Sequence, residues 1–329
     1  MRAPRKGSWP EGVVVSVIRE RADRCPGAYR PWPAEDGWLV RLRLVGGRIS
    51  KRSLSALSAV AQEFGDGRVY LTGRANLQVR AFPGSSAGLS ESALAALRGT
   101  GLLPSRTHEL ARNIMLSPQS GLAGGRADLR FLAADLDRLI CVDPVLAALP
   151  GRFLFVLDDG RGDLLDRPAD LGLVALDHQR GQVRIGAGWA EVVSLDRAAL
   201  RLAALAAAFL HARGSGASAP WHIRELAAPA IATSLAPVAD PDPLLPRPLA
   251  PLPYGPVPGG RHQPAPETGL DGAAIAALTG AYSPTDLTAT SDADDHPTTD
   301  AATTTTDAAT DLIVTPWRGI LIPEGERHE

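Results

Sequence analysis

The stretch Thr72-Gly73-Arg74-Ala75-Asn76-Leu77-Gln78-Val79-Arg80 is the most informative part of this chain. Polar and apolar residues alternate along it, and this period of two predicts a β-strand with one polar and one apolar face. The polar face carries guanidiniums and carboxamides, from Arg74, Asn76, Gln78 and Arg80. Arginine captures carboxylates and other oxyanions through paired hydrogen bonds. The pattern therefore indicates either an anion-binding surface or a solvated sheet face in an arginine-rich protein.

The composition is that of a globular chain with room for two modest domains. The 329 residues are 45% hydrophobic but only 5% aromatic, so the core is expected to consist of Ala, Leu and Val. A formal net charge of −2 argues against nucleic acid as a main partner. Arginine is the usual basic residue throughout, as is typical of a GC-rich genome, so only the placement of the arginines is informative.

The cysteines and the hydropathy pattern limit which metal sites and which cellular locations the sequence allows. Cys25 and Cys141 form neither a disulfide framework nor a local metal-ligand spacing, and we expect no metal site. The basic N-terminus is followed by no apolar run, and no stretch of about 20 apolar residues predicts a membrane helix. We therefore expect a cytoplasmic protein without a membrane partner.

The first domain is expected over 24–105, after an N-terminal tail over 1–23. Alternation predicts strands over 37–44, 69–71 and 76–82. The helical period predicts a helix from Ser50 or Ser53 to Phe64 and another that begins at Ser90. The order β-α-β-β-α predicts an α+β fold with helices on one face of a sheet.

A second block over 106–228 alternates helices and strands. Helices are predicted over 129–140 and 197–211, and strands over 153–157, 171–176 and 182–185. This alternation predicts a second, α/β domain.

The rest of the chain is predicted to be a linker over 229–310. Proline recurs from Pro229 to Pro266, which predicts an extended segment without central strands or helices. One short helix is expected within 268–281, and the Thr/Ala/Asp-rich tract 282–310 is expected to be disordered. The strand-like segment 311–323 must then pair with the earlier domain or remain unpaired.

Arginines on neighbouring strands are candidates for a binding groove. Arg41 and Arg43 share one strand face, and sequential strands are usually neighbours. Together with Arg74 and Arg80 they would line a groove suited to a ligand with many carboxylates. Alternatively, the four side chains lie along the sheet and pair with Asp or Glu, and the pattern favours neither arrangement.

Two further polar pairs are weaker candidates. Arg112 and Asn113 precede an apolar run and a Gly-rich loop, which suits a binding site or simply the end of a strand. Asp158 and Asp159 could act as a carboxylate pair, but turn chemistry explains them better.

Three motifs, in order along the chain, resemble those of the sirohaem-dependent nitrite and sulfite reductases. Residues 72–80 resemble the T-x-R-x-x-[FIL]-Q-x-[RH] strand of their ferredoxin-like half-domain. Ala111–Ile114 resembles N-R-N-[VI], and Leu149–Phe153 resembles L-P-R-K-F-K. The precorrin-3B synthase branch of this superfamily is the closer match, through residues 25–27, 36–43 and 314–318. The resemblance covers about 24–225 and 311–323, and it implies that 106–228 is a sulfite-reductase-like domain and 311–329 the remnant strand of a second half-domain.

The resemblance also implies roles for particular residues. Arg74 and Arg112 would bind an anionic substrate and tetrapyrrole carboxylates, and Arg152 would replace a substrate-binding lysine. Leu154 stands where a second lysine belongs, which argues against reduction of sulfite or nitrite. The implied activity is that of an oxidoreductase of cobalamin biosynthesis that acts on a carboxylated precorrin with molecular oxygen. The complete set of expected binding residues is Arg41, Arg43, Arg74, Asn76, Gln78, Arg80, Arg112, Asn113 and Arg152.

The resembled family uses a 4Fe-4S cluster, and its reductases also use sirohaem. Four cysteines in a second half hold that cluster, and Cys25 and Cys141 cannot supply four thiolates. We therefore expect a truncated or split homologue that holds no cofactor alone. Four alternatives remain open: an incomplete precorrin-3B-synthase-like oxidoreductase, a sirohaem-type reductase homologue, a non-catalytic tetrapyrrole-binding remnant, and one subunit of a split enzyme with the cluster on a partner polypeptide.

Overall fold

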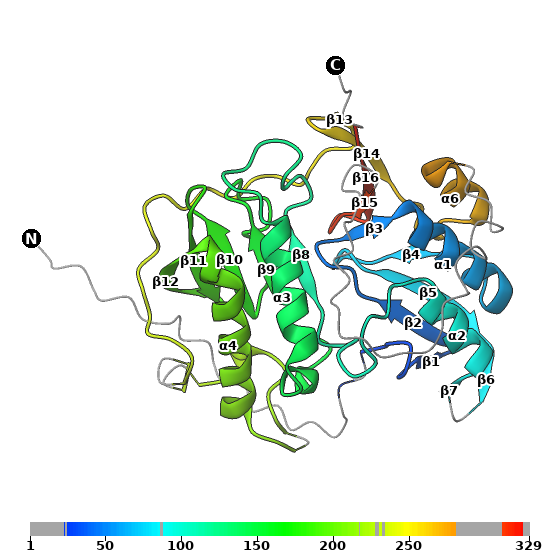
Figure 1. Ribbon diagram of the computed structural model, residues 1–329, viewed down its shortest axis with the longest axis horizontal. Helices are drawn as coiled ribbons and strands as arrows, with labels where there is room; N and C mark the ends of the chain where they lie inside the picture. The colour runs from blue at the N-terminus through cyan, green and yellow to red at the C-terminus, as the bar shows by residue number, and fades with distance from the viewer. Residues whose placement is uncertain are drawn as a thin grey trace, which may run out of the picture.

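The computed structural model describes residues 23, 25–85, 88–216, 218–227, 230–231, 234–280 and 311–324. Two bodies of helices and sheets lie side by side, one drawn mainly in blue and cyan and the other in green (Figure 1). The expected tail over 1–23, apart from Asp23, and the expected disordered tract over 282–310 lie outside the described residues.

An antiparallel sheet with strand order β1-β2-β5-β4 is the centre of the first body. Its strands are β1 (Trp32–Ala34), β2 (Gly37–Leu42), β4 (Tyr70–Leu71) and β5 (Leu77–Phe82). Helices α1 (Lys51–Phe64) and α2 (Glu91–Gly99) pack on it, and the short pair β6 (Gly84–Ser85) and β7 (Gly88–Leu89) precedes α2. Both helices begin at predicted caps, because the hydroxyls of Ser50 and Ser90 accept backbone N–H groups. The predicted α+β ferredoxin-like unit is confirmed.

A second sheet, of order β13-β14-β16-β15-β3, joins the C-terminal segment to this body. Its strands are β3 (Arg48–Ser50), β13 (Gly255–Val257), β14 (Gly260–Pro264), β15 (Asp311–Val314) and β16 (Gly319–Pro323). Strand β15 runs antiparallel to β3, with Leu312 opposite Ile49. The segment 311–323 therefore consists of two strands rather than one, and it pairs with the first body.

The prediction that residues 229–266 contain no central strand is wrong at β14, which is hydrogen-bonded on both sides. The prolines do not prevent this arrangement, because Pro256 lies in the edge strand β13 and Pro264 is the last residue of β14. The predicted short helix within 268–281 is α6 (Gly272–Thr279), which packs beside α1.

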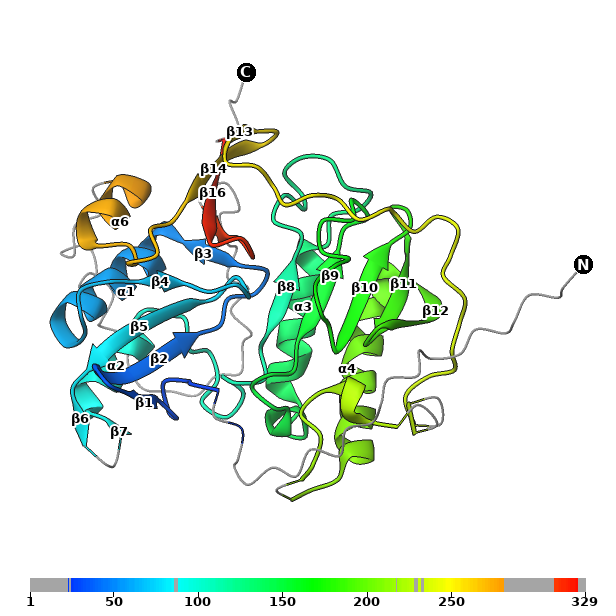
Figure 2. The same cartoon turned by 180° about the vertical axis from the view of Figure 1, so that it is seen from behind.

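The second body is built on a mixed sheet of order β12-β11-β10-β9-β8. Its strands are β8 (Ile114–Leu116), β9 (Phe155–Asp158), β10 (Leu171–Ala175), β11 (Arg180–Ile185) and β12 (Gly188–Ser194). Helices α3 (Arg130–Val142) and α4 (Leu195–Arg213) cover one of its faces, as both views show (Figures 1 and 2). Two short 3₁₀ turns, η1 (Leu146–Ala148) and η2 (Ile223–Glu225), complete it. The core between helices and sheet is almost entirely aliphatic, with Phe153, Phe155 and Phe209 at its centre.

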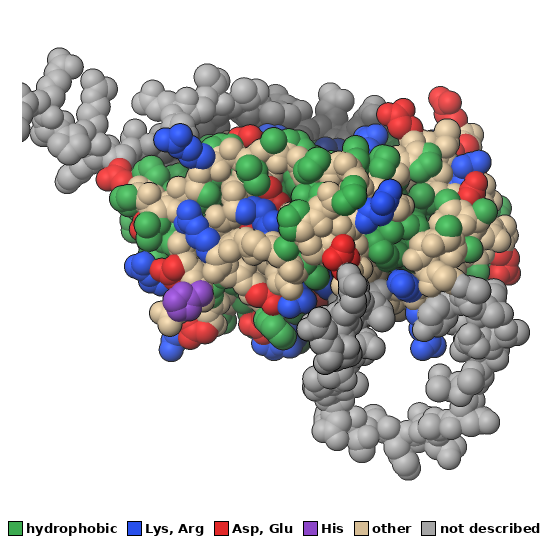
Figure 3. Space-filling view, turned by 90° about the horizontal axis from the view of Figure 1, so that it is seen from above, with side chains coloured by type: hydrophobic (Ala, Val, Ile, Leu, Met, Phe, Trp, Pro, Cys, Tyr) green, Lys and Arg blue, Asp and Glu red, His purple; other side chains and the backbone are tan. Residues whose placement is uncertain are grey.

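The two bodies meet where the chain leaves β2. Val45 forms a parallel bridge with Ile114 at the start of β8, so loops of both bodies converge there. On the face seen in Figure 3, basic, acidic and apolar side chains are interspersed, as the near-zero net charge suggests. In the described part of the chain, no helix combines the length and apolar character needed to cross a bilayer.

Candidate functional site

A buried polar cluster joins the two bodies, and three of the predicted binding residues form it: Arg43, Asn76 and Asn113. The Oδ1 atom of Asn113 accepts hydrogen bonds from Arg43 Nε at 3.0 Å and from Asn76 Nδ2 at 3.4 Å. Its Nδ2 atom donates to the Gly151 carbonyl at 2.9 Å, and Arg43 also donates to that carbonyl. These polar atoms form hydrogen bonds with one another and with the backbone, so the cluster holds the two bodies together and does not present a ligand-binding surface.

The alternating stretch 72–80 is not one strand: β5 begins at Leu77, in agreement with the strand predicted over 76–82, and a turn precedes it. The Thr72 N–H donates to the Asn76 carbonyl at 2.9 Å, and the Asn76 N–H donates to Thr72 Oγ1 at 3.2 Å. Ala75 takes a left-handed conformation, with φ of 55°. This turn buries the Asn76 side chain and directs Arg74 toward the second body, where its Nη1 donates to the Arg152 carbonyl at 3.0 Å.

Three guanidiniums meet beyond the polar cluster, and we call Arg41, Arg74 and Arg152 the arginine site. Burial lowers the pKa of Arg41, and the nearby charges of Arg74 and Arg152 lower it further. Burial also lowers the pKa of Arg74; the charges of Asp170 and Asp23 oppose that effect, and the charge of Arg152 adds to it. Since like charges repel, three guanidiniums near two carboxylates favour a further anion close to them.

Few protein groups among the described residues compensate this charge. Arg41 Nη2 donates to Gln78 Oε1 at 3.2 Å, while its buried Nε has no partner. The carboxylate of Asp23 lies 3.5 Å from Arg152 Nε. The Arg152 guanidinium also lies over the Trp221 ring, 5.2 Å from its centroid. The arginine site thus combines excess positive charge, the Nε–H of Arg41 without a hydrogen-bond partner, and the aromatic ring of Trp221.

Two other predicted binding residues are engaged in ion pairs elsewhere. Arg80 Nε lies 3.1 Å from Asp36 Oδ2 at the other end of β5. Arg112 donates to both carboxylate oxygens of Asp137 on α3, at 2.6 and 2.9 Å. The four-arginine groove expected on β2 and β5 therefore does not form, although the two strands are neighbours as predicted and pair Arg41 with Gln78.

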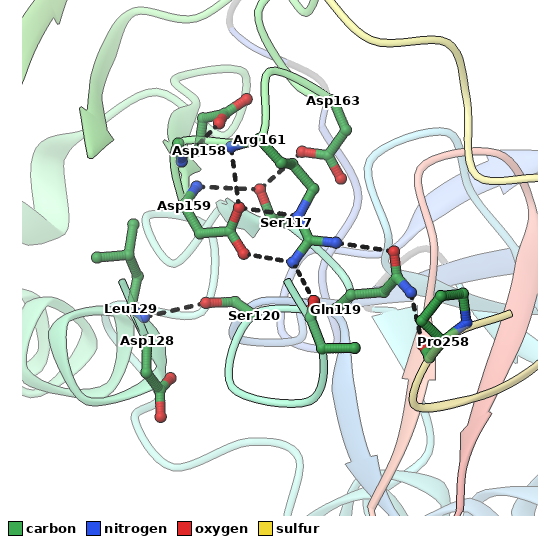
Figure 4. Close-up of polar contacts among 12 residues, drawn as sticks. Ser117, Gln119, Ser120, Asp128, Leu129, Asp158, Asp159, Arg161, Asp163 and Pro258 are labelled. Atoms are coloured by element: carbon green, nitrogen blue, oxygen red, sulfur yellow. Dashed lines mark hydrogen bonds and ion pairs between the residues drawn. The ribbon is translucent and has the colours of Figure 1, made fainter. Parts of the chain in front are cut away.

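Three aspartates, Asp158, Asp159 and Asp163, lie at the end of β9 and in the loop that follows it (Figure 4). Asp158 accepts three backbone N–H groups, and Asp159 forms an ion pair with Arg161. Asp163 accepts a hydrogen bond from Ser117 Oγ at 2.7 Å, and burial together with the charge of Asp158 raises its pKa to about 7. One oxygen of each of the three carboxylates lies within 4.8 Å of the others, and the contacts above engage these carboxylates within the protein. The sequence-based preference for turn chemistry agrees with these contacts.

Several residues beside the arginine site were not predicted. They are Asp23, Asp170, Trp221 and His222, which come from segments far apart in the chain. Trp221 and His222 are adjacent just before η2. The only local feature of the sequence that could have drawn attention to them is a Trp-His pair soon after a helix. Nothing in the sequence links them to Arg74 or Arg152.

The cysteines do not fit an iron–sulfur cluster. Cys25 is buried beside Gly151 and Arg43, and its pKa is raised, mainly by burial. Cys141 lies on α3, where burial and the charge of Asp137 raise its pKa. Two separate, protonated thiols cannot replace the four thiolates that such a cluster requires.

Comparison with known proteins agrees with the fold. Residues 32–97 match the nitrite/sulfite reductase ferredoxin-like half domain. The solved structure of the NirA protein of Mycobacterium tuberculosis aligns with a TM-score of 0.60 at 18% identity, over 94% of this chain and 58% of that one. These findings define the class of fold: residues 32–97 are a nitrite/sulfite reductase ferredoxin-like half domain, and the chain as a whole shares the fold of NirA.

Among curated proteins, the chain is similar to a precorrin-3B synthase of Sinorhizobium sp.. The two are 27% identical over 190 residues, which cover 56% of this chain and 38% of the relative. The chain thus spans 58% of the solved NirA chain, and its match covers 38% of the precorrin-3B synthase. The expected resemblance to the precorrin-3B synthase branch is confirmed.

Proposed function

We propose that this chain binds a carboxylated tetrapyrrole of the precorrin type at the arginine site, as part of a precorrin-3B-synthase-like system of cobalamin biosynthesis. The observation that carries the proposal is the proximity of three guanidiniums, Arg41, Arg74 and Arg152, with only the carboxylates of Asp23 and Asp170 identified near them among the described residues. Carboxylates on a macrocycle would supply the missing negative charge through charge-assisted hydrogen bonds. The indole of Trp221 offers a flat surface beside those charges.

The proposal narrows the predicted set of binding residues. Arg41, Arg74, Gln78 and Arg152 remain as ligand-binding residues. Arg43, Asn76 and Asn113 support them through the buried cluster, since Asn113 and Arg43 hold the Gly151 carbonyl next to Arg152. Arg80 and Arg112 are left out because Asp36 and Asp137 already compensate their charges.

Leu154 favours a precorrin over sulfite or nitrite as the ligand. Its side chain is buried in an apolar cluster with Met115, Val156 and Leu164, so this position presents no cation. A small oxyanion undergoing reduction needs concentrated positive charge around it, whereas a large polycarboxylate makes contacts that are spread over several arginines.

The proposal contains no redox step on this chain, because Cys25 and Cys141 do not fit a cluster. A cluster-bearing partner polypeptide and a cytoplasmic location remain predictions from the sequence. The binding function is separate from both and can be tested alone.

The test is a fluorescence titration of the protein with uroporphyrin, a porphyrin rich in carboxylates. The variant Arg41→Met keeps the apolar stem of the side chain and removes its charge. If Arg41 makes one charge-assisted contact, the affinity falls by about 1–3 kcal/mol, or about 5- to 150-fold. The matched control is Arg180→Met, because Arg180 is an exposed arginine in the second body that pairs with Asp177.

Selective loss of affinity in Arg41→Met, together with weaker binding at higher salt, supports the proposal. Equal affinity in the wild type, Arg41→Met and Arg180→Met would eliminate the arginine site as the binding surface. Absence of saturable binding by the wild type would eliminate the function itself.

A further inference from the structure

A turn between the two C-terminal strands repeats the turn that precedes β5. In both turns the N–H of the first residue donates to the carbonyl of the fifth, at 2.8 Å in 315–319 and at 2.9 Å in 72–76. In both, the N–H of the fifth residue donates to the threonine hydroxyl of the first, at 3.1 and 3.2 Å. The fourth residue is left-handed in each, with φ of 58° at Arg318 and 55° at Ala75. The same local structure therefore occurs twice in the chain.

The strands around the two turns repeat as well. Strands β15 and β16 form a hairpin as β4 and β5 do, and β14 adds to β16 as β2 adds to β5. Leu270 bridges Val69 one residue before the cap of α6, just as Ile49 pairs with Leu312 one residue before the cap of α1. The chain thus contains two related units, in which α6 takes the place of α1.

In the first unit, helix α2 packs beside α1 on the core of the sheet. Helix α1 lies between α2 and α6 and contacts both (Figures 1 and 2). Ala93 and Leu97 of α2 belong to the same apolar core as Leu57 of α1. After α2 the chain stays close to α1, because a Cβ on Gly101 would lie 3.9 Å from Ser53 Oγ. Helix α2 therefore covers one side of α1.

A groove lies where the second unit would place a counterpart of α2. It runs between α6 and the strands β14 and β16, and its volume is about 330 Å³. Three apolar side chains that line it correspond to core residues of the first unit: Leu278, Ile320 and Ile322 stand where Leu57, Leu77 and Val79 stand. Ala274 and Ala277 of α6 also line it, and Ala274 corresponds to Ser53. Among the described residues, no helix fills the groove as α2 does in the first unit.

Helix α6 has the composition of a helix that is covered on several sides. Its residues, Gly272–Thr279, include no charged side chain. Ile275 is buried in the core of the first body, whereas Leu278 is half-buried and Ala277 exposed at the groove. A helix that is apolar all round is normally buried in a protein core. The composition of α6 thus fits a further element packed against it.

We propose that this groove docks an amphipathic helix of a partner polypeptide, which would lie beside α6 as α2 lies beside α1. Its apolar stripe would resemble that of α2, in which Ala93, Leu94 and Leu97 share one side. The tract over 282–310 has no such stripe, because Leu287 is its only leucine and it contains no isoleucine, valine, methionine or phenylalanine. This interaction is independent of the proposed tetrapyrrole binding.

The probe for the test is a fluorescein-labelled peptide with the sequence of residues 88–103, which include α2. A lactam bridge joins Glu91 to the side chain introduced by Ala95→Lys, because so short a helix is marginal in isolation. Both positions are exposed on α2, so the bridge leaves the apolar side free. We expect saturable binding to the wild-type protein by fluorescence anisotropy. The Leu97→Asp peptide should bind at least about tenfold more weakly, because it lacks a central apolar side chain. This comparison uses unmodified protein, so it does not depend on how a variant folds.

Two variants of α6 locate the bound peptide. Ala277→Arg puts a long charged side chain into the groove and should weaken binding at least about tenfold. Ala276→Arg is the matched control, because Ala276 is also exposed on α6 but does not line the groove. It should bind the peptide as the wild type does.

The inference is overturned if the peptide shows no saturable binding to the wild type up to about 1 mM. It is equally overturned if Ala277→Arg and Ala276→Arg bind the peptide alike. A dimer in sedimentation velocity that Ala277→Arg dissociates would assign the groove to a second copy of the chain and overturn the inference as well. None of these results depends on uroporphyrin, so the proposed function stands or fails separately.

Discussion

Arg112 and Arg74 occupy equivalent places in the sequence-based prediction, but the structure gives them different roles, and mutation separates these roles. The Arg112 guanidinium donates two hydrogen bonds to Asp137 at 2.6 and 2.9 Å, and the two side chains are only 8% and 17% exposed. Arg112→Ala removes one partner and leaves the carboxylate of Asp137 without compensation.

The expected cost follows from this geometry. Breaking a buried ion pair by removing one partner costs about 3–5 kcal/mol. Asp137 keeps some contact with solvent, so we expect the free energy of unfolding to fall by about 2–4 kcal/mol. For a domain of this size that corresponds to a fall in Tm of about 4–16 °C. Affinity for uroporphyrin, measured well below the Tm, should change little.

Urea unfolding and the uroporphyrin titration, performed on the same samples, measure both effects. Arg138→Ala is the matched control, because Arg138 lies on the helix of Asp137 and forms an exposed ion pair with Asp135. The two side chains of that pair are 62% and 43% exposed, and the pair should contribute under about 1 kcal/mol to stability. Arg74→Ala should show the reverse behaviour, with an affinity loss of about 1–3 kcal/mol. The reasoning is refuted if Arg112→Ala unfolds like the wild type and loses affinity as Arg74→Ala does.

Three further outcomes are expected from unfolding measurements. Asn113→Ala should lower stability by at least about 2 kcal/mol in urea, because buried groups of Arg43 and Gly151 lose their partner; a loss under 0.5 kcal/mol would contradict the supporting role of that cluster. Asp163 has its pKa raised to about 7 in the fold, so its stabilising contribution is present at low pH and is lost as the pH rises toward 7; Asp163→Asn should raise the urea midpoint at pH 8 more than at pH 5. Gly47→Ala should lower the free energy of unfolding more than Gly67→Ala does. Gly67→Ala brings only backbone strain of about 1–2 kcal/mol, because Gly67 has open space around it, whereas a Cβ on Gly47 would lie 2.1 Å from the Val314 carbonyl oxygen. Equal urea midpoints for the two variants would argue against the pairing of β15 with the first body.

Local patterns predicted the regular elements of the two bodies well. The helix starts at Ser50 and Ser90 followed from capping chemistry, and the hydroxyls accept the expected N–H groups. The long alanine- and leucine-rich segment from Arg197 to His211 lies within α4 (Leu195–Arg213). These features depend on neighbours a few residues apart, which is the range over which sequence periodicity is informative.

The candidate site was only partly predictable, because contacts distant in sequence decide it. The alternation in 72–80 continues through a turn whose hydrogen bonds bury Asn76, so the four polar side chains do not share a face. The sequence left two interpretations of the arginines open, a binding groove and ion pairs along the sheet, and each applies to some of them. Arg80 pairs with Asp36, while Arg41 and Arg74 lie near Arg152. The pairing of 311–314 with 48–50 likewise spans most of the chain and has no local signal.

The central claim is that the arginine site binds a carboxylated tetrapyrrole, and a crystal structure of the protein grown with uroporphyrin tests it most directly. We predict porphyrin carboxylates within hydrogen-bond distance of the Arg41, Arg74 and Arg152 guanidiniums, with the macrocycle next to Trp221. A porphyrin bound elsewhere on the protein, with these three guanidiniums free of contact to it, would contradict the account.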